Sequence, residues 1–326
     1  MTTLSAQVVV VGSFNVDHVW TTATLPRAGE TLSGRYSTGP GGKGFNQAIA
    51  SARAGAGTSL VCALGDDAGG QLARALATAD RIDLRAATCD APTGTAGIYV
   101  DGEGRNSIVI GAGANALLAP AFVAAQADAI AAASVLLVQL ESPAGAITEA
   151  LRTARGRGVA TVLNPAPANA ATTRELLALA DILTPNETEF AGLVSRHVGE
   201  RIDGDAITAL DQAHLHALCR ELAPAGTVVV TLGASGCFVS HAADTQHGDD
   251  KPFYRLAAEQ VHAVDTTGAG DAFNGALAAA LAREPDAAFA RHLQFASRYA
   301  ALSTEREGAA LAMPRREDVE ARFGPS

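Results

Sequence analysis

The sequence predicts an α/β fold in which helices flank a doubly wound, mostly parallel β-sheet. Short apolar runs rich in β-branched residues alternate with segments rich in alanine and leucine, as in sheets that are covered on both faces. The chain has 326 residues, of which 48% are hydrophobic and 18% charged, so it can bury a large core. A single unit over residues 1–326 is therefore expected.

The strands of the main sheet are predicted where the apolar runs are continuous. These runs lie at residues 7–12, 59–65, 134–140, 160–167, 181–186 and 227–233. Helices are predicted between them, at residues 46–54, 70–79, 143–155 and 174–179. In such alternating folds, ligands bind beyond the carboxyl ends of the strands.

A second, smaller β-sheet is predicted from two regions that interrupt this alternation. Its strands come from about residues 14–40 and 93–112. In the second region, Gly102, Glu103 and Gly104 are expected to form the turn of a β-hairpin. We expect this sheet to be a lid or a dimer surface attached to the main sheet.

Composition excludes some classes of partner. The formal net charge is -10 and no basic block interrupts the sequence, so nucleic acid is not an expected partner. The alanine-rich stretch 119–133 carries Gln126 and Asp128, so no membrane span is expected there. A cytoplasmic protein is predicted, because no signal-like segment opens the chain and its cysteines form no C-x-x-C pair. The cysteines, expected to be reduced thiols, are Cys62, Cys89, Cys219 and Cys237.

The stretch STGPGGKGFNQA, residues 37–48, raises the question of a phosphate-binding loop. A Walker A motif needs a glycine five residues before Gly42, where Ser37 stands, and a Ser or Thr after Lys43, where Gly44 stands. No G-x-G-x-x-G motif follows the first strand either. The glycines are therefore expected to bring the backbone close to a small ligand. The alternative is a flexible loop before a helix.

The stretch AVDTTGAGDAFNGALAAAL, residues 263–281, is predicted to carry the chemistry. Gly268, Ala269 and Gly270 turn the chain, and Asp271 opens a long helix. Backbone amides at a helix start favour negative charge. A carboxylate there can accept a proton from a hydroxyl while the amides stabilise a transferring phosphoryl group. The alternative is that Asp271 only caps the helix, although a cap does not need the surrounding glycines.

These two stretches resemble known signatures. DTTGAGDAF resembles the C-terminal signature of the ribokinase (phosphofructokinase-B type) family of sugar kinases, and GGKGFNQA resembles its N-terminal signature in the ribokinase form. Shorter matches extend over nearly the whole chain. They are GSFNVDHV (12–19), LPRAGET (25–31), GDDAGG (65–70), GANA (113–116), QLESP (139–143), LNPAPA (163–168), TPNETE (184–189) and TLGASG (231–236).

The resemblance implies an ATP-dependent kinase that phosphorylates the O5 hydroxyl of D-ribose to give D-ribose 5-phosphate. It implies Asp271 as the base, Mg²⁺ at the phosphates, K⁺ as a monovalent activator, and a homodimer formed through the β lid. A kinase of the same family that acts on deoxyribose, another sugar or a nucleoside is one alternative. A non-catalytic sugar-binding regulator is another, although such a relative would be expected to lose Asp271 or the G-A-G turn.

The resemblance also implies which residues bind the sugar. Polar groups that would hydrogen-bond its hydroxyls are Asn15, Asp17, Gly42, Lys43, Asn46, Glu141 and Asp271. The apolar face of the sugar would be lined from the lid hairpin by Ala96, Ile98 and Ile110. Those three positions are equally expected to be core-facing residues of the hairpin.

Nucleotide and cation sites are implied in the same way. Asn186 and Glu189 would form an N-x-x-E element at the phosphates and the magnesium-bound water, or would only cap a helix. The other nucleotide contacts would be Thr231, Gly233, Ser235, Gly236, Gly270 and, on the adenine side, Ser297. The monovalent cation would be held by Asp265 and Thr267 together with backbone carbonyls of Ser303, Arg306, Gly308 and Ala312.

Two positions depart from the family pattern. Phe45 stands where the ribokinase form of the signature has alanine, and its ring either packs in the core or narrows the sugar pocket. Leu311 and Ala312 stand where proline and serine are common, which bears on the last ligand of the cation site.

Overall fold

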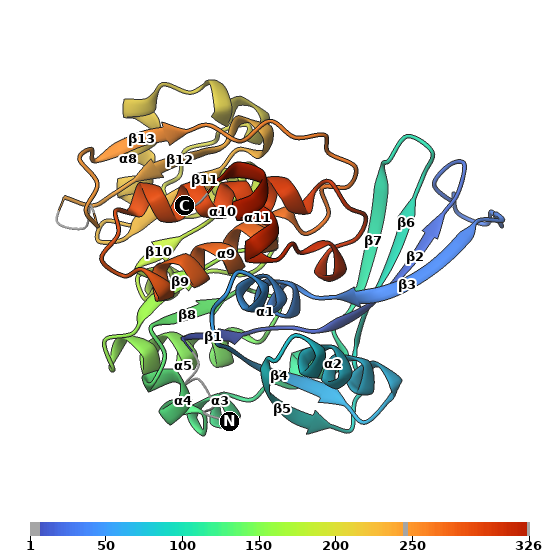
Figure 1. The fold of residues 1–326 in the computed structure, drawn as a ribbon. Helices are drawn as coiled ribbons and strands as arrows, with labels where there is room; N and C mark the ends of the chain where they lie inside the picture. Colours follow the sequence, from blue (N-terminus) through green and yellow to red (C-terminus); the bar gives the residue numbers. More distant parts are fainter. Residues whose placement is uncertain (1–6, 244–246, 325–326) are drawn as a thin grey trace.

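The computed structural model describes residues 7–243 and 247–324. Of the predicted unit 1–326, residues 1–6, 244–246 and 325–326 lie outside the described residues. Within the described part, a nine-stranded sheet has the order β13-β12-β11-β10-β9-β8-β1-β4-β5 (Figure 1). The strands are β1 (Val8–Val11), β4 (Thr58–Gly65), β5 (Asp83–Cys89), β8 (Val135–Val138), β9 (Ala160–Leu163), β10 (Ile182–Leu183), β11 (Thr227–Thr231), β12 (Cys237–Ser240) and β13 (Phe253–Leu256).

This arrangement confirms the mostly parallel sheet. Pairing is parallel from β11 through β5, and only β12 and β13 run antiparallel, at one edge. All six predicted strands are present, although the fourth and fifth end early, at Leu163 and Leu183. The strands β5, β12 and β13 were not predicted. Two of them, β5 and β13, lie at the sheet edges and are only partly buried, so their sequences lack a continuous apolar run.

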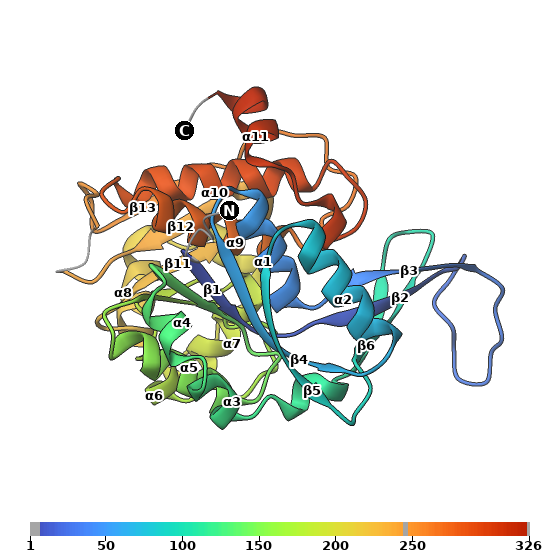
Figure 2. The same ribbon diagram turned by 60° about the horizontal axis from the view of Figure 1, so that its bottom comes forward.

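Helices cover both faces of the sheet (Figure 2). One layer contains α1 (Lys43–Arg53), α2 (Ala68–Ala79), α9 (Ala269–Arg283), α10 (Phe289–Ser303) and α11 (Arg316–Phe323). The other contains α3 (Pro120–Ala124), α4 (Ala127–Ala131), α5 (Ala144–Arg155), α6 (Arg174–Leu177), α7 (Glu187–His197) and α8 (Gln212–Leu222). Short 3₁₀ turns are η1 (Gly113–Leu117), η2 (Gly204–Ala209), η3 (Gly233–Ser235) and η4 (Ala310–Ala312). Among the described residues, no helix has the length and apolarity that crossing a membrane requires.

The alternation of side chains along β1 divides the core between the two layers. Val8 and Val10 pack with residues of α1 and α9, whereas Val9 and Val11 pack with residues of α5 and α7. Because both faces of β1 are buried, all four of its positions are occupied by an apolar residue, valine. This explains why the central strands read as continuous apolar runs in the sequence.

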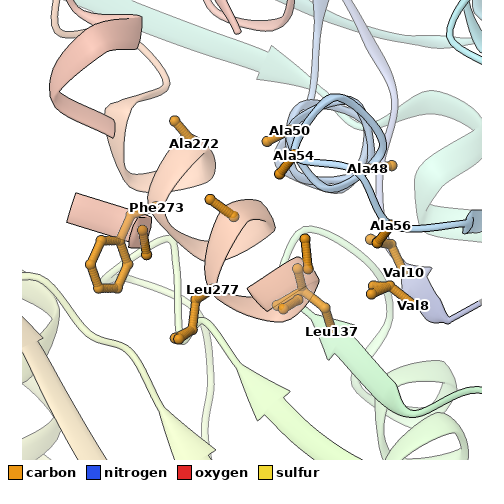
Figure 3. Packing of buried hydrophobic residues seen from close by; sticks show 14 of the residues in the cluster. Val8, Val10, Ala48, Ala50, Ala54, Ala56, Leu137, Ala272, Phe273 and Leu277 are labelled. Carbon is orange, nitrogen blue, oxygen red and sulfur yellow. The ribbon is translucent and has the colours of Figure 1, made fainter. Parts of the chain in front are cut away.

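The helices α1 and α9 are in direct contact above the sheet. Figure 3 shows Ala50 of α1 and Ala54, the C-cap residue of α1, facing Ala272 of α9, above Val8, Val10 and Leu137. At Gly275 of α9, an added Cβ would lie 2.4 Å from the backbone oxygen of Gln47. Only glycine therefore allows this close approach. The contact places the two signature stretches side by side at the N-termini of neighbouring helices.

The second sheet is also present, and it projects from the main body (Figure 1). It has the order β3-β2-β6-β7, with strands β2 (Asn15–Thr21), β3 (Arg35–Gly41), β6 (Gly94–Val100) and β7 (Asn106–Gly111). Asp101 stabilises the predicted hairpin turn, because its Oδ1 accepts hydrogen bonds from the amides of Glu103 and Arg105, each at 3.0 Å. Ile108, Val109 and Ile110 of β7 are more than half exposed.

Candidate active site

A cleft opens at the carboxyl ends of the parallel strands. It is bounded by the N-termini of α1, α7 and α9. The predicted residues that line it are Lys43, Asn186, Glu189, Thr231, Gly268, Ala269, Gly270 and Asp271. Residues that were not predicted also line it, namely Asn164, Ala166, Thr184, Thr266 and Asn274. The cleft thus gathers residues from distant parts of the chain.

Asp271 lines this cleft and is only 6% exposed. Helix α9 begins at Ala269, and Gly268 is its N-cap residue. The alternative that Asp271 only caps the helix is therefore wrong. Its carboxylate instead faces α1, where Oδ2 accepts a hydrogen bond from Asn46 Nδ2 at 2.9 Å and Oδ1 accepts one from Gln47 Nε2 at 2.9 Å.

Burial and the neighbouring groups shift the pKa of Asp271 in opposite directions. Burial raises the pKa of Asp271, while the Lys43 ammonium and the two amide hydrogen bonds act to lower it. Burial alone would lower the pKa of Lys43, but the carboxylates of Asp271, Glu141 and Glu189 raise it. Lys43 is therefore a cation held among three carboxylates. Its ammonium group therefore offsets part of the negative charge at this end of the cleft.

The turn before α9 is shaped by one glycine. Gly268 has φ 76°, and a Cβ at this position would lie 2.9 Å from the Cβ of Ala309. Of the three amides predicted to face an anion, that of Ala269 donates to the carbonyl of Thr266 at 3.1 Å. Within the described residues, the amides of Gly268 and Gly270 have no such partner. These two amides are thus available to an anion in the cleft.

The sugar-side residues predicted from the sequence lie next to the same cleft. Glu141 accepts hydrogen bonds from Ser13 Oγ at 2.6 Å and from the backbone amide of Lys43 at 2.9 Å. Burial, with the nearby charges of Glu141 and Asp271, raises the pKa of Asp17 to about 7. A Cβ at Gly41 would meet the Asp17 carboxylate at 2.1 Å, so glycine makes room for that side chain.

Asn15 and Gly42 are held by the backbone around the first strand. Gly42 has φ 87°, and a Cβ there would lie 2.8 Å from the amide of Asn15. Asn115 Nδ2 donates to Asn15 Oδ1 at 2.8 Å, and Asn115 Oδ1 accepts from the amide of Phe14 at 3.0 Å. Asn115 was not predicted as a site residue, although it lies in the GANA match. It fixes the segment that presents Asn15.

Asn186 and Glu189, which are predicted to lie at the phosphates of the nucleotide, have two roles. Asn186 and Glu189 form a capping box at the start of α7, with Asn186 N to Glu189 Oε2 at 2.9 Å and Glu189 N to Asn186 Oδ1 at 2.8 Å. The interpretation of this motif as a helix cap is thus correct, and both side chains also line the cleft. Burial raises the pKa of Glu189. Thr231 adjoins them, since its amide donates to Pro185 O at 2.9 Å.

Comparison with known proteins places the chain in a family. Residues 5–316 match the model of the pfkB family of carbohydrate kinases. The chain belongs to this family.

Individual relatives agree. Mouse ribokinase is 38% identical over 97% of this chain and 94% of its own length. Ribokinase of Haemophilus influenzae is 36% identical over 95% of this chain and 96% of its own length. Among solved structures, Arabidopsis thaliana ribokinase complexed with ribose and ATP has a TM-score of 0.82 at 30% identity, covering 99% of this chain and 100% of that one. Ribokinase from Thermotoga maritima has a TM-score of 0.85 at 30% identity, covering 98% of this chain and 100% of that one. The predicted family, fold class and kinase activity are confirmed.

Within this pfkB kinase, the cation segments predicted from the resemblance lie close together. Asp265 Oδ1 accepts from the amide of Thr267, and its Oδ2 accepts from the amide of Gly308, both at 2.9 Å. Although burial alone would raise it, the Thr267 side chain and these two amide hydrogen bonds lower the pKa of Asp265. Ser303 and Arg306 lie on the same segment as Gly308, and Ala312 follows as a buried residue of η4.

The η4 turn is tied to the helix that carries Lys43. The guanidinium of Arg53, at the end of α1, donates to Met313 O at 2.9 Å and pairs with both oxygens of Asp80 at 2.8 and 2.9 Å. Arg53 was not predicted from the sequence, because neither partner is near it along the chain. It links the predicted cation segment to α1.

The remaining predicted residues differ in their exposure and in where they lie in the fold. Ala96 is buried and pairs in register with both Asp17 and Ile110, Ile98 is partly buried, and Ile110 is 51% exposed. Ile110 is therefore not a core residue of this chain. Gly233 and Gly236, with φ 51° and 91°, flank Ser235 in the η3 turn after β11. Ser297 lies within α10 and is not among the described residues that line the cleft.

Phe45 belongs to the core. It is fully buried, and its ring packs edge-on against that of Phe14 with centroids 4.9 Å apart. Its backbone amide donates to Ser13 O at 2.8 Å. The interpretation that Phe45 narrows the sugar pocket is therefore wrong. The ring anchors in the core the first turn of α1, which carries Lys43.

Proposed function

We propose that this chain is an ATP-dependent ribokinase that transfers the γ-phosphoryl group of ATP to the O5 hydroxyl of D-ribose. The observation that carries the proposal is the buried carboxylate of Asp271, which lies in one cleft with Lys43 and the N-terminus of α9. A base, a cation and helix amides around one cavity are the requirements of phosphoryl transfer to an alcohol. Relatives named ribokinase, at 36–38% identity over nearly the full chain, support the choice of ribose.

In this proposal Asp271 accepts the proton of the attacking hydroxyl. The amides of Gly268 and Gly270 donate to the transferring phosphoryl group, with Ala269 between them. Lys43 supplies a positive charge that compensates the negative charge developing there. Asp271 is held on both oxygens by α1, so its position is set before the sugar arrives.

The sugar is proposed to bind between the main sheet and the β2–β3–β6–β7 sheet. Its hydroxyls would be paired by Asn15, Asp17, Gly42, Lys43, Asn46 and Glu141. The proximity of Asp17, Glu141 and Lys43 supports this assignment, because a polyol needs several fixed polar partners. Ala96, Ile98 and Ile110 would cover its apolar face.

The nucleotide is proposed to enter along β11. Thr231, Gly233, Ser235 and Gly236 would lie beneath it, with Ser297 toward the base. Mg²⁺ would be held through water by Glu189 and Asn186. One carboxylate with water and phosphate oxygens suits an ion that keeps most of its water ligands. Bound there, it would neutralise phosphate charge.

A monovalent cation is proposed beside the turn that begins α9. Asp265, Thr267 and the carbonyls of Ser303, Arg306, Gly308 and Ala312 would hold K⁺. The hydrogen bond between Asp265 and the amide of Gly308 supports this site, because it joins the two segments. Ala309 packs against Gly268, so an ordered segment would also order the turn.

The whole chain is proposed to act as one cytoplasmic kinase unit, with the small sheet from about residues 14–40 and 93–112 as its lid. A homodimer through this lid is part of the proposal. Exposed apolar side chains on both faces of this sheet, Tyr36 and Val109 on one and Ile108 and Ile110 on the other, support such an interface.

A panel of acceptors tests the function. D-ribose, 2-deoxy-D-ribose, hexoses and nucleosides are assayed for ATP-dependent phosphorylation, with product position determined by NMR. The expected result is the highest kcat/KM for D-ribose and phosphate on O5. A higher kcat/KM for another acceptor would replace ribose in the proposal, and sugar binding without turnover with any acceptor would identify a non-catalytic regulator.

A further inference from the structure

A chain of buried amides leads from the centre of the sheet to Asp271. Gln139, which follows β8, donates from Nε2 to Gln47 Oε1 at 2.5 Å. Gln47 Nε2 in turn donates to Asp271 Oδ1 at 2.9 Å and to Asn164 Oδ1 at 3.1 Å. Asn164 Nδ2 donates to the backbone oxygen of Thr184 at 3.0 Å. Gln47 and Gln139 are fully buried, so this chain is shielded from water.

Filling a protein core with such hydrogen-bonded amides has a high desolvation free energy. A buried amide loses its hydrogen bonds to water, and it adds little to stability even when it is fully paired. Gln139 Oε1 remains without a hydrogen-bond partner among the described residues. Apolar side chains of similar size would fill the same space at lower cost. The feature that distinguishes this place in the core is the carboxylate of Asp271.

The direction of these hydrogen bonds, from donor to acceptor, is fixed. Gln47 Oε1 accepts from Gln139, so the NH₂ group of Gln47 must point toward Asp271 and Asn164. Asn46, the next residue on α1, binds the other carboxylate oxygen. Neither of these two amides is among the described residues that line the cleft, but Asn46 is a proposed ligand of the sugar, whereas Gln47 is fully buried. Gln47 is therefore the partner that Asp271 keeps when a substrate binds.

We infer that Gln47 is a positioning residue for the proposed base. It holds one oxygen of Asp271 so that the other faces the acceptor hydroxyl, and it favours the ionised carboxylate. Gln139 acts one step further away by fixing the orientation of the Gln47 amide. The inference rests on the proposed function, since it assigns Gln47 to the reaction that Asp271 catalyses.

The electrostatic consequence has a definite sign. The other charged groups around Asp271 are Lys43 of α1, Glu141 after β8, Glu189 of α7 and Asp17 of β2. Among the described residues, Gln47 forms no hydrogen bond to any of these four side chains. Its hydrogen bond acts to lower the pKa of Asp271. Replacing Gln47 by an apolar residue therefore raises that pKa. The base is then protonated up to a higher pH, and activity on the acid side is lost earlier as the pH falls.

The test uses Gln47→Met, which keeps the length of the side chain, and Ser51→Ala as a matched control. Ser51 lies on the same helix, is equally buried, and accepts a hydrogen bond from Thr58 Oγ1 at 3.1 Å. Rates are measured from pH 5 to 9 with saturating D-ribose and ATP. For Gln47→Met, kcat should fall roughly 10- to 100-fold near neutral pH, and the acid limb should move up by about one pH unit. Ser51→Ala should leave both unchanged.

Other outcomes remain decisive. A folded Gln47→Met enzyme with the wild-type acid limb and kcat overturns the inference. If Gln47→Met does not fold, Gln139→Met replaces it, and a smaller shift of the limb in the same direction is expected, whereas an unmoved limb overturns the inference. Failure of the proposed function looks different, because the wild-type enzyme itself would then show no phosphorylation of D-ribose.

Discussion

Asn46 Nδ2 lies 2.9 Å from Asp271 Oδ2, although 225 residues separate the two along the chain. This contact joins the glycine–lysine stretch to the catalytic stretch. It is made possible by Gly275, where the two helices touch. The sugar loop and the proposed base are therefore parts of one rigid unit, and changes at either are expected to affect phosphoryl transfer.

The replacement Asp271→Asn tests the base. It keeps the shape of the side chain but removes the oxygen that accepts the proton, so kcat should fall on the order of 10²–10⁴-fold. Calorimetric titration should still detect ATP and D-ribose, because their other contacts survive. Since Gly268 is the N-cap residue of α9, loss of helix capping cannot account for the effect. Near-normal turnover in the folded variant would remove the catalytic assignment.

Phe45→Ala tests the role of the buried ring. Loss of a fully buried phenylalanine should lower the free energy of unfolding by roughly 3–5 kcal/mol. Urea denaturation measures this loss, and the ranking of pentoses and hexoses by kcat/KM should stay as in the wild type at a temperature where the variant is folded. A changed ranking at unchanged stability would contradict the core assignment.

The raised pKa of Asp17 predicts a pH-dependent stability. Its pKa of about 7 in the folded protein lies above the ordinary value of 3.8, so the folded state binds more protons than the unfolded state between these values. Stability associated with Asp17 is therefore present below pH 4 and is lost as the pH rises through 7. Asp17→Asn should raise Tm at pH 8 and have little effect near pH 4, as measured by calorimetry. An equal change in Tm at both values would exclude this linkage.

Potassium is expected to activate the enzyme by ordering the segment that packs against Gly268. Activity should be several times higher in potassium chloride than in sodium or choline chloride at the same ionic strength. Asp265→Asn should abolish the difference, because it removes the charge that joins both segments. Equal wild-type rates in the three salts would eliminate the cation site from the proposal.

The sequence predicted the central strands well because each is buried on both faces, as the valines of β1 illustrate. It did not predict β5 or β13, since edge strands are only partly buried and carry charged residues such as Asp83 and Arg255. Asp271 could be identified from its local motif. Its partner Gln47 could not be assigned a role, although it lies within the signature, because that role depends on a helix contact across 224 residues.

The close crossing of α1 and α9 also has a consequence for how the protein is made. Helix α1 leaves the ribosome about 225 residues before its partner, a delay of roughly 10–45 s at ordinary rates of synthesis. Throughout that delay, the apolar residues of α1 that pack on α9 in the folded protein lack this contact. The face of β1 that carries Val8 and Val10 is then covered by α1 but not by α9. The nascent chain therefore exposes apolar surface until its last fifth emerges. Its catalytic centre is among the last features of the molecule to form.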